Sequence, residues 1–131
     1  MDTHQVILEM PAAPAFASLA RATAARMAAM GGLTLEGVED LRLAVSEVYA
    51  ALVATPGVST VTITFSAPTT GLDPVRLQLA AQCPHGLPTE ADLGVAWTLA
   101  KALVDDASWS QVEHGVVVDL AMSTRARSGA A

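Results

Sequence analysis

The sequence contains very few of the residues that build disulfide frameworks and metal centres. Among its 131 residues it has one cysteine, Cys83, and three histidines. A single cysteine cannot form an internal disulfide, and so few histidines argue against a structural zinc site. Cys83 and His85 are near neighbours, but two ligands do not complete a metal site. We therefore expect neither a disulfide nor a bound metal.

Basic residues are also scarce. The chain has 7 lysines and arginines against 13 acidic residues, which gives a formal net charge of −6. Two of the basic residues, Arg125 and Arg127, stand in the last ten positions of the sequence. Nucleic-acid binding requires a basic patch that neutralises several phosphates, and this chain offers none. The composition therefore argues against direct DNA or RNA binding and leaves proteins or a small ligand as the expected partners.

A long apolar run is the third absence. Charged residues interrupt the apolar stretches before any reaches the length of a membrane span, about 18 residues. Asp2 and His4 stand where a signal peptide would carry lysine or arginine. We expect a cytoplasmic protein with no membrane association. Its length and its hydrophobic content of 52% predict one globular domain, residues 1–122, followed by a flexible polar tail, residues 123–131.

What the sequence does contain is a regular succession of strand and helix patterns. Alternation of apolar and polar residues predicts strands, and apolar residues at helical spacing predict helices. The predicted strands are His4–Met10, Ser59–Ser66, Val75–Ala81, Ala107–Glu113 and Val116–Met122, and the predicted helices are Ala15–Met30, Val38–Val53 and Leu93–Val104. This order predicts a two-layer α/β sandwich, in which three helices cover one face of a mixed, mostly antiparallel sheet of about five strands.

The predicted helix Val38–Val53 is the segment around which the rest of the chain is organised. One apolar stripe along it consists of Val38, Leu41, Val45, Val48 and Leu52. A second stripe beside it consists of Asp40, Ala44, Glu47 and Ala51. Glu47 is therefore a carboxylate at the border of the core. The pattern alone leaves two interpretations open, a solvated glutamate at the rim or a catalytic group.

Four segments resemble the anti-sigma factor and serine-protein-kinase branch of the GHKL ATPases, which have the Bergerat fold. Asp40–Ala51 resembles the N-box helix of that family, and Ala91–Asp106 resembles its second glycine box with the helix that follows. Ser18–Thr23 is similar to the first helix of sporulation and stress anti-sigma factors, and His114–Leu120 is similar to their final strand. The resemblance covers nearly the whole domain and implies a Bergerat-like fold.

The residues that carry ATP chemistry in that family are matched only in part. In the family, a glutamate of the N-box is the general base, and an asparagine one helical turn later binds the magnesium that bridges the ATP phosphates. Glu47 matches the glutamate, whereas Ala51 occupies the asparagine position. Magnesium requires oxygen ligands, and an alanine side chain supplies none.

The first nucleotide-binding loop departs further from the family pattern. Gln82 stands where the family has the aspartate that contacts the adenine amino group. Of the two glycines that should follow, only Gly86 remains, because Pro84 occupies the other position. Proline fixes φ and removes an N–H where glycine would leave the backbone free to approach a nucleotide.

The ATP lid and the second glycine box are reduced as well. Only Leu87–Ala91 remain in place of a long lid. The second box keeps Gly94, but its first glycine is replaced by Asp92, a carboxylate that we expect to face the phosphate position and repel it. We therefore expect nucleotide binding to be weak or absent, and no cofactor to be required.

The resemblance therefore predicts a protein that acts by binding other proteins. Members of the family sequester a sigma factor, generally as homodimers, and are released by an anti-anti-sigma factor of the STAS fold. Arg21 matches an arginine on the first helix that contacts both partners. Without the resemblance, such an arginine is a solvated edge residue. The implied function is that of an anti-sigma factor-like regulator of transcription, and opposite charge would speed its association with a basic sigma factor.

Two alternatives stay open. An active serine-protein kinase would phosphorylate its STAS antagonist with ATP and magnesium, using Glu47 as the base. That interpretation has to explain Ala51 and the short lid. The same fold could instead bind another kind of signalling protein.

Overall fold

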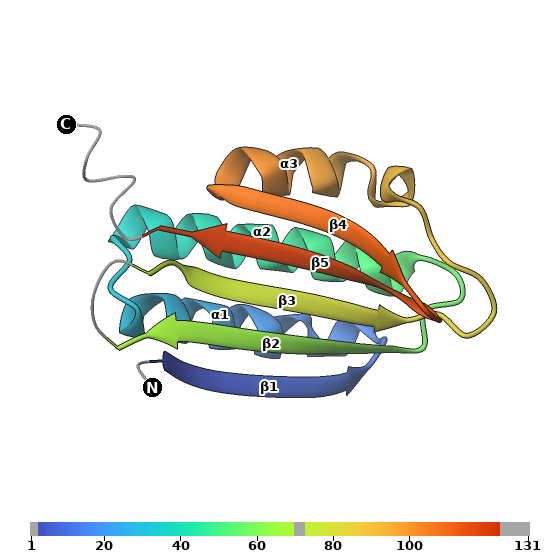
Figure 1. The fold of residues 1–131 in the computed structure, drawn as a ribbon, viewed down its shortest axis with the longest axis horizontal. Coiled ribbons are helices and arrows are strands. Elements are labelled where there is room, and N and C mark those ends of the chain that lie inside the picture. The colour runs from blue at the N-terminus through green and yellow to red at the C-terminus, as the bar shows by residue number, and fades with distance from the viewer. Residues whose placement is uncertain (1–2, 70–72, 124–131) are drawn as a thin grey trace.

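The computed structural model describes residues 3–69 and 73–123 (Figure 1). The strands are β1 (Thr3–Pro11), β2 (Thr60–Pro68), β3 (Val75–Gln82), β4 (Asp106–Val112) and β5 (Gly115–Met122). The α-helices are α1 (Ala17–Met30), α2 (Leu35–Ala54) and α3 (Val95–Leu103), and the short 3-10 helices η1 (Pro14–Phe16) and η2 (Glu90–Leu93) precede α1 and α3. Every predicted helix and strand is present, and only its bounds differ.

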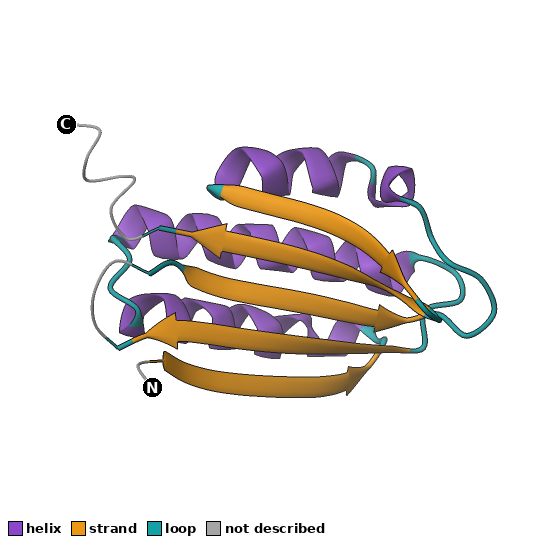
Figure 2. Ribbon diagram, viewed as in Figure 1, coloured by secondary structure: helices purple, strands orange, loops and turns teal. Residues whose placement is uncertain are grey.

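The five strands form one sheet in the order β1-β2-β3-β5-β4, and each neighbouring pair is antiparallel. The three α-helices lie on one face of this sheet and leave the opposite face open (Figure 1, Figure 2). The expected two-layer α/β sandwich is confirmed. The sheet is antiparallel throughout the described strands because β5 lies between β3 and β4.

Alternation along the strands places the apolar side chains under the helices. In β3, Val75, Leu77, Leu79 and Ala81 are buried, whereas Arg76, Gln78 and Gln82 are exposed on the open face. The inward residues of β2 and β5 and the apolar stripe of α2 complete a single core. Removal of this apolar surface from water is the main contribution that favours the fold.

The buried side of α1 differs from the expected one. Helical spacing alone places Phe16, Leu19, Ala20, Thr23 and Met27 on one side of this segment, the side expected to face the core, but Leu19 is 45% exposed. The buried residues are Ala20, Ala24, Met27 and Ala28. An alanine-rich helix has no strong apolar stripe, so its rotation is set by packing. The small alanines allow the helix to approach its neighbours closely.

Hydrogen bonds fix the start of α2 and its attachment to the chain before α1. The Thr34 hydroxyl accepts a hydrogen bond from the backbone N–H of Gly37 at 3.1 Å, so Thr34 caps the N-terminus of α2. Tyr49 is fully buried on α2 and donates its hydroxyl proton to the carbonyl oxygen of Ala13 at 2.8 Å. Burial raises the pKa of Tyr49 above its ordinary value of 10.0.

Residues 124–131, most of the predicted tail, lie outside the described residues. Within residues 3–69 and 73–123, no helix is both long enough and apolar enough to cross a membrane.

Candidate functional site

The candidate catalytic glutamate lies on the helical layer. Glu47 is half-buried in α2, and its carboxylate makes no hydrogen bond or salt bridge with any other described residue. One turn later, Ala51 is also half-buried, and its backbone carbonyl accepts a hydrogen bond from the Thr55 hydroxyl at 2.8 Å. The side chain at this position therefore offers no oxygen to a metal ion.

Gln82 points in a different direction from Glu47. As the last residue of β3, Gln82 continues the set of side chains on the open face of the sheet and is exposed. Its backbone oxygen accepts a hydrogen bond from the N–H of Ser59 at 2.9 Å. The inward position belongs to the next residue, Cys83, which is buried. Burial raises the pKa of the Cys83 thiol, which disfavours the reactive thiolate.

The residues of the loop after β3 line two separate hollows. A hollow of about 480 Å³ on the sheet side includes Gln82, Pro84, Val112 and His114 in its wall. Another, of about 370 Å³ at the end of α2, includes Gly86 and Asp92. Glu47 and Gly94 line neither of these two hollows. Gln82 and Pro84 therefore line one hollow, and Gly86 and Asp92 line another.

The side chain of Asp92 accepts hydrogen bonds at the start of η2. The backbone N–H of Thr89 donates a hydrogen bond to Asp92 Oδ2 at 2.7 Å, and the Thr89 hydroxyl lies 3.3 Å from the same oxygen. Thr89 and Asp92 thus form a capping box at the start of this short helix. The carboxylate is thus hydrogen-bonded to the chain that precedes it, and the expectation that it repels a phosphate stays a prediction.

Gly94 controls where α3 begins. Its backbone has φ of 57° and ψ of −133°, a combination that essentially only glycine adopts. The sequence predicted a helix that starts at Leu93. Because the chain turns at Gly94, the helix starts at Val95 instead. The glycine match in the second box has a structural reason in this chain.

A side-chain hydrogen bond that the sequence did not predict joins η2 to α3. The indole N–H of Trp97 donates a hydrogen bond to Glu90 Oε2 at 2.5 Å, and the Lys101 ammonium lies 5.6 Å from the centre of the Trp97 ring. Trp97 itself is buried. A tryptophan between a carboxylate and a cation fixes the geometry of this corner. The signal in the sequence was the spacing of Trp97 and Lys101, one helical turn apart.

Arg21 lies between α1 and α2. It is half-buried, and its Nη1 donates a hydrogen bond to the hydroxyl of Ser46 at 3.3 Å. Ser46 directly precedes Glu47 in α2, so the structure brings the predicted partner-binding arginine next to the helix that carries the predicted catalytic residue. Leu43, one turn before Ser46, is 43% exposed. We call Arg21, Leu43, Ser46 and Glu47 the α1–α2 patch.

No side-chain cluster in the described part of the chain has the three or more histidine, cysteine, aspartate or glutamate ligands that would hold a metal ion.

Comparison with solved structures places this architecture among known folds. The chain is similar to the crystal structure of the RsbU and RsbW domains of Rv1364c from Mycobacterium tuberculosis, with a TM-score of 0.68 and 19% sequence identity. The two share a fold. The match covers 91% of this chain but 32% of that one, so the present chain spans about a third of that protein's length. No family model matches the sequence, and no curated protein is significantly similar to it.

Proposed function

We propose that the protein is an anti-sigma factor-like regulator that acts in the cytoplasm by binding a sigma factor, without using ATP. Two observations support the family assignment: the resemblance of Asp40–Ala51 to the N-box helix, and the fold shared with a structure that contains an RsbW domain. Neither the sigma factor nor its STAS antagonist follows from the fold alone.

The observation that carries the proposal is the distribution of the nucleotide-box residues. Gln82 is exposed on the open face of the sheet, whereas Glu47 lies in the helical layer. The carboxylate of Asp92 is committed to a capping box, and Ala51 offers no metal ligand. Groups that bind one nucleotide must converge on it, because only positioned and desolvated contacts contribute to affinity. The dispersion supports a role that does not depend on ATP.

The α1–α2 patch is the surface that we assign to the sigma factor. It combines an arginine with an exposed leucine on two rigid helices, and arginine is enriched in the residues that dominate protein interfaces. The guanidinium of Arg21 donates a hydrogen bond to Ser46, which holds it in place before a partner binds. An arginine positioned in advance loses less conformational entropy on binding than a freely moving one.

The first experiment measures binding of the purified protein to each sigma factor of its host by calorimetry. We expect Arg21→Glu to weaken binding at least tenfold, which corresponds to about 1.4 kcal/mol. Arg76→Glu is the matched control, because it makes the same charge change on the open face of the sheet. Unchanged binding by the Arg21 variant, or equal losses in both variants, would refute the assignment of the α1–α2 patch.

A second candidate function is an active serine-protein kinase that phosphorylates a STAS protein. The observation in its favour is Glu47, a half-buried carboxylate that makes no bond with the other described residues and so remains available as a base. Titration with ATP and ADP, with and without magnesium, distinguishes the two functions. We expect no heat and no thermal shift. Micromolar binding, followed by phosphate transfer to a STAS partner that Glu47→Gln abolishes, would establish the kinase instead.

The resemblance also leads us to propose a homodimer. Sedimentation equilibrium at concentrations from about 1 to 100 µM covers the range in which weak and strong interfaces are distinguished. A molecular mass that stays at the monomer value throughout this range would contradict it.

A further inference from the structure

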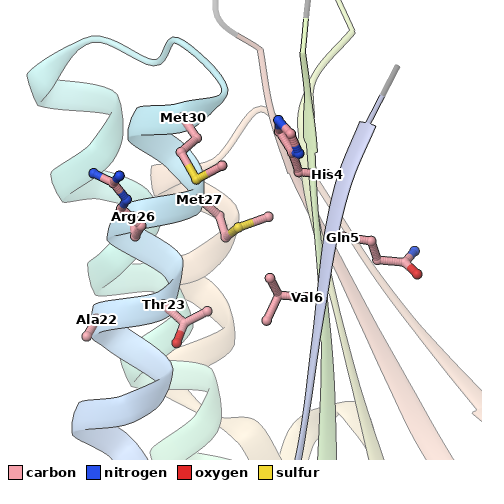
Figure 3. A pocket seen from close by; sticks show the side chains of 8 residues that line it. All are labelled: His4, Gln5, Val6, Ala22, Thr23, Arg26, Met27 and Met30. Atoms are coloured by element: carbon pink, nitrogen blue, oxygen red, sulfur yellow. The ribbon is translucent and has the colours of Figure 1, made fainter. Parts of the chain in front are cut away.

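Exposed apolar side chains gather where the free edge of the sheet meets α1. On β1, Val6 is 37% exposed and Ile7 is 57% exposed, and on α1 the values are 45% for Leu19 and 42% for Met30. A groove of about 450 Å³ separates the two elements, and Val6 and Met27 point into it from opposite sides (Figure 3). Burial of this surface by another molecule would therefore be favourable.

The apolar side of α1 that the core leaves uncovered faces β1. Helical spacing places Leu19, Thr23 and Met30 on one side of the helix. Thr23 and Met30 line the groove, so Leu19 extends the same surface along the helix. The apolar stripe that the sequence shows on α1 is therefore only partly buried within one molecule.

The backbone of β1 is regular and open to a further strand. β1 pairs with β2 alone, in an uninterrupted register from Thr3 to Pro11. The N–H of Ala12 continues this ladder and donates to the carbonyl oxygen of Ser59 on the β2 side at 3.0 Å. Because backbone groups alternate in direction along a strand, those of Ile7 and of every second residue from it point to the free edge. Bulges, lysine or proline usually protect such an edge, and β1 has none of these before Pro11.

The sequence of β1 is complementary to itself. If two copies of the strand lie antiparallel with Ile7 opposite Ile7, all nine residues of each copy overlap. Gln5 of one copy then stands opposite Glu9 of the other, where its amide can donate a hydrogen bond to the carboxylate. Val6 stands opposite Leu8 on the side of the helices. Any other register shortens the overlap and separates Gln5 from Glu9.

We propose that β1 binds β1 of a second copy of the chain in this register, which joins the two sheets into one and covers both grooves. The inference rests on the homodimer proposed above and assigns its interface. A two-fold axis through Ile7 makes the contact isologous, so each residue serves on both copies. The α1–α2 patch stays accessible, because Arg21 lies on the side of α1 that contacts α2.

The charges favour a second copy over an unrelated strand. Arg26 leaves α1 on the side away from β1, so it gives a foreign segment no cation to recognise at the edge (Figure 3). The one acidic residue of β1 is Glu9, and Gln5 of the copy supplies its partner. The edge therefore contains, in its own sequence, the groups that it needs from a neighbouring strand.

Cysteine cross-linking tests the register. Residues opposite each other on antiparallel strands have Cα atoms about 5.5 Å apart, within reach of a disulfide. We expect Ile7→Cys to form a disulfide-linked dimer on oxidation. Gln5→Cys and Glu9→Cys should not cross-link alone, because each lies about 13 Å or more from its own copy, but they should cross-link when mixed. The unaltered protein is the control, since its Cys83 is buried.

Sedimentation equilibrium tests the strength of the contact. Ile7→Lys sets two like charges opposite each other and should weaken the dimer about tenfold or more. Thr64→Lys is the matched control, because Thr64 stands opposite Ile7 on β2 and the variant adds the same charge to the same face of the sheet. Circular dichroism shows whether both variants stay folded.

The outcomes separate this interface from the homodimer itself. A protein that stays monomeric at every concentration would refute both. A dimer in which Ile7→Cys does not cross-link, or which Ile7→Lys and Thr64→Lys weaken equally, would keep the homodimer and overturn the β1 interface. Cross-linking of Val6→Cys or Leu8→Cys in place of Ile7→Cys would overturn the register. None of these results decides the sigma-factor site, which Arg21→Glu tests.

Discussion

At the scale of single residues, Tyr49 connects the centre of the core to a distant backbone segment. Its ring is fully buried, and its hydroxyl donates a hydrogen bond to Ala13 in the connection before α1. Removal of the hydroxyl takes away one of the two hydrogen bonds that this carbonyl accepts, and the one from the N–H of Phe16 at 3.2 Å remains. We expect Tyr49→Phe to lower the free energy of unfolding by about 1–2 kcal/mol, as measured by urea denaturation at pH 7.

The same residue predicts a loss of stability in alkali. Burial raises the pKa of folded Tyr49 above 10.0, so above that pH the unfolded chain releases its tyrosine proton first. The stabilisation is complete below pH 10 and is lost as the pH rises through the folded pKa. Tyr49 is the one tyrosine of the chain, so tyrosinate absorbance reports it alone. If Tyr49→Phe shows the same decline between pH 10 and 12, another group is responsible.

At the scale of elements, two glycines illustrate opposite requirements at the starts of helices. Gly94 has a φ of 57° before α3, and a Cβ built on it would meet no atom within 4 Å. Gly37 lies within α2, where a Cβ would make ordinary contacts at 3.4 Å with Leu33 and Thr34. A side chain at Gly94 would therefore destabilise the fold through an unfavourable backbone conformation and not through a steric clash.

We expect Gly94→Ala to lower the free energy of unfolding by about 1–3 kcal/mol. Gly37→Ala is the matched control and should raise it by about 0.5–1 kcal/mol, because alanine favours the helix. Thermal unfolding followed by circular dichroism measures both. A neutral result for Gly94→Ala would show that the turn before α3 relaxes without cost.

The fold was largely predictable because each strand and helix carries a clear period. β2 and β3 alternate strictly, and Thr34 and Gly94 stand at the ends where caps and turns are needed. The rotation of α1 was not predictable, since Leu19 gave a false apolar stripe on a helix made mainly of alanine. The place of β5 between β3 and β4 is a long-range choice that no local pattern encodes.

The candidate site was predictable as a set of positions but not as an arrangement. Gln82 continues the outward set of Arg76 and Gln78, but the predicted strand ended at Ala81, so its direction was not predicted. Likewise, the bond between Trp97 and Glu90 spans the turn at Gly94, and no helical spacing predicts a contact across such a turn.

At the scale of the whole molecule, Cys83 reports how the sandwich opens. The thiol is buried, its pKa is raised, and its backbone N–H donates a hydrogen bond to His114 on the β4–β5 hairpin at 2.8 Å. A thiol reagent reaches it only when this end of the sheet separates. We expect its labelling in the folded protein to be roughly a thousandfold slower than in denaturant, or slower still.

Measurement of the labelling rate against urea concentration determines how much of the molecule must open. A rate that follows global unfolding would mean that the loop after β3 belongs to the cooperative core. A rate that does not change below the unfolding transition would mean that this loop opens locally. That result would contradict the expectation that the Cys83 thiol is reached only when this end of the sheet separates.

The insertion of β5 into the sheet also has a consequence for biosynthesis. Within the sheet, β4 contacts β5 alone, yet it leaves the ribosome first. Until Gly115–Met122 emerges, the nascent chain carries β3 with one bare edge and β4 with no neighbouring strand. The sheet therefore cannot close progressively during translation. A pause or a premature stop before Gly115 would leave β3 and β4 with unpaired edges that chaperones would have to cover. Synthesis of β5 would then pair both edges in a single step.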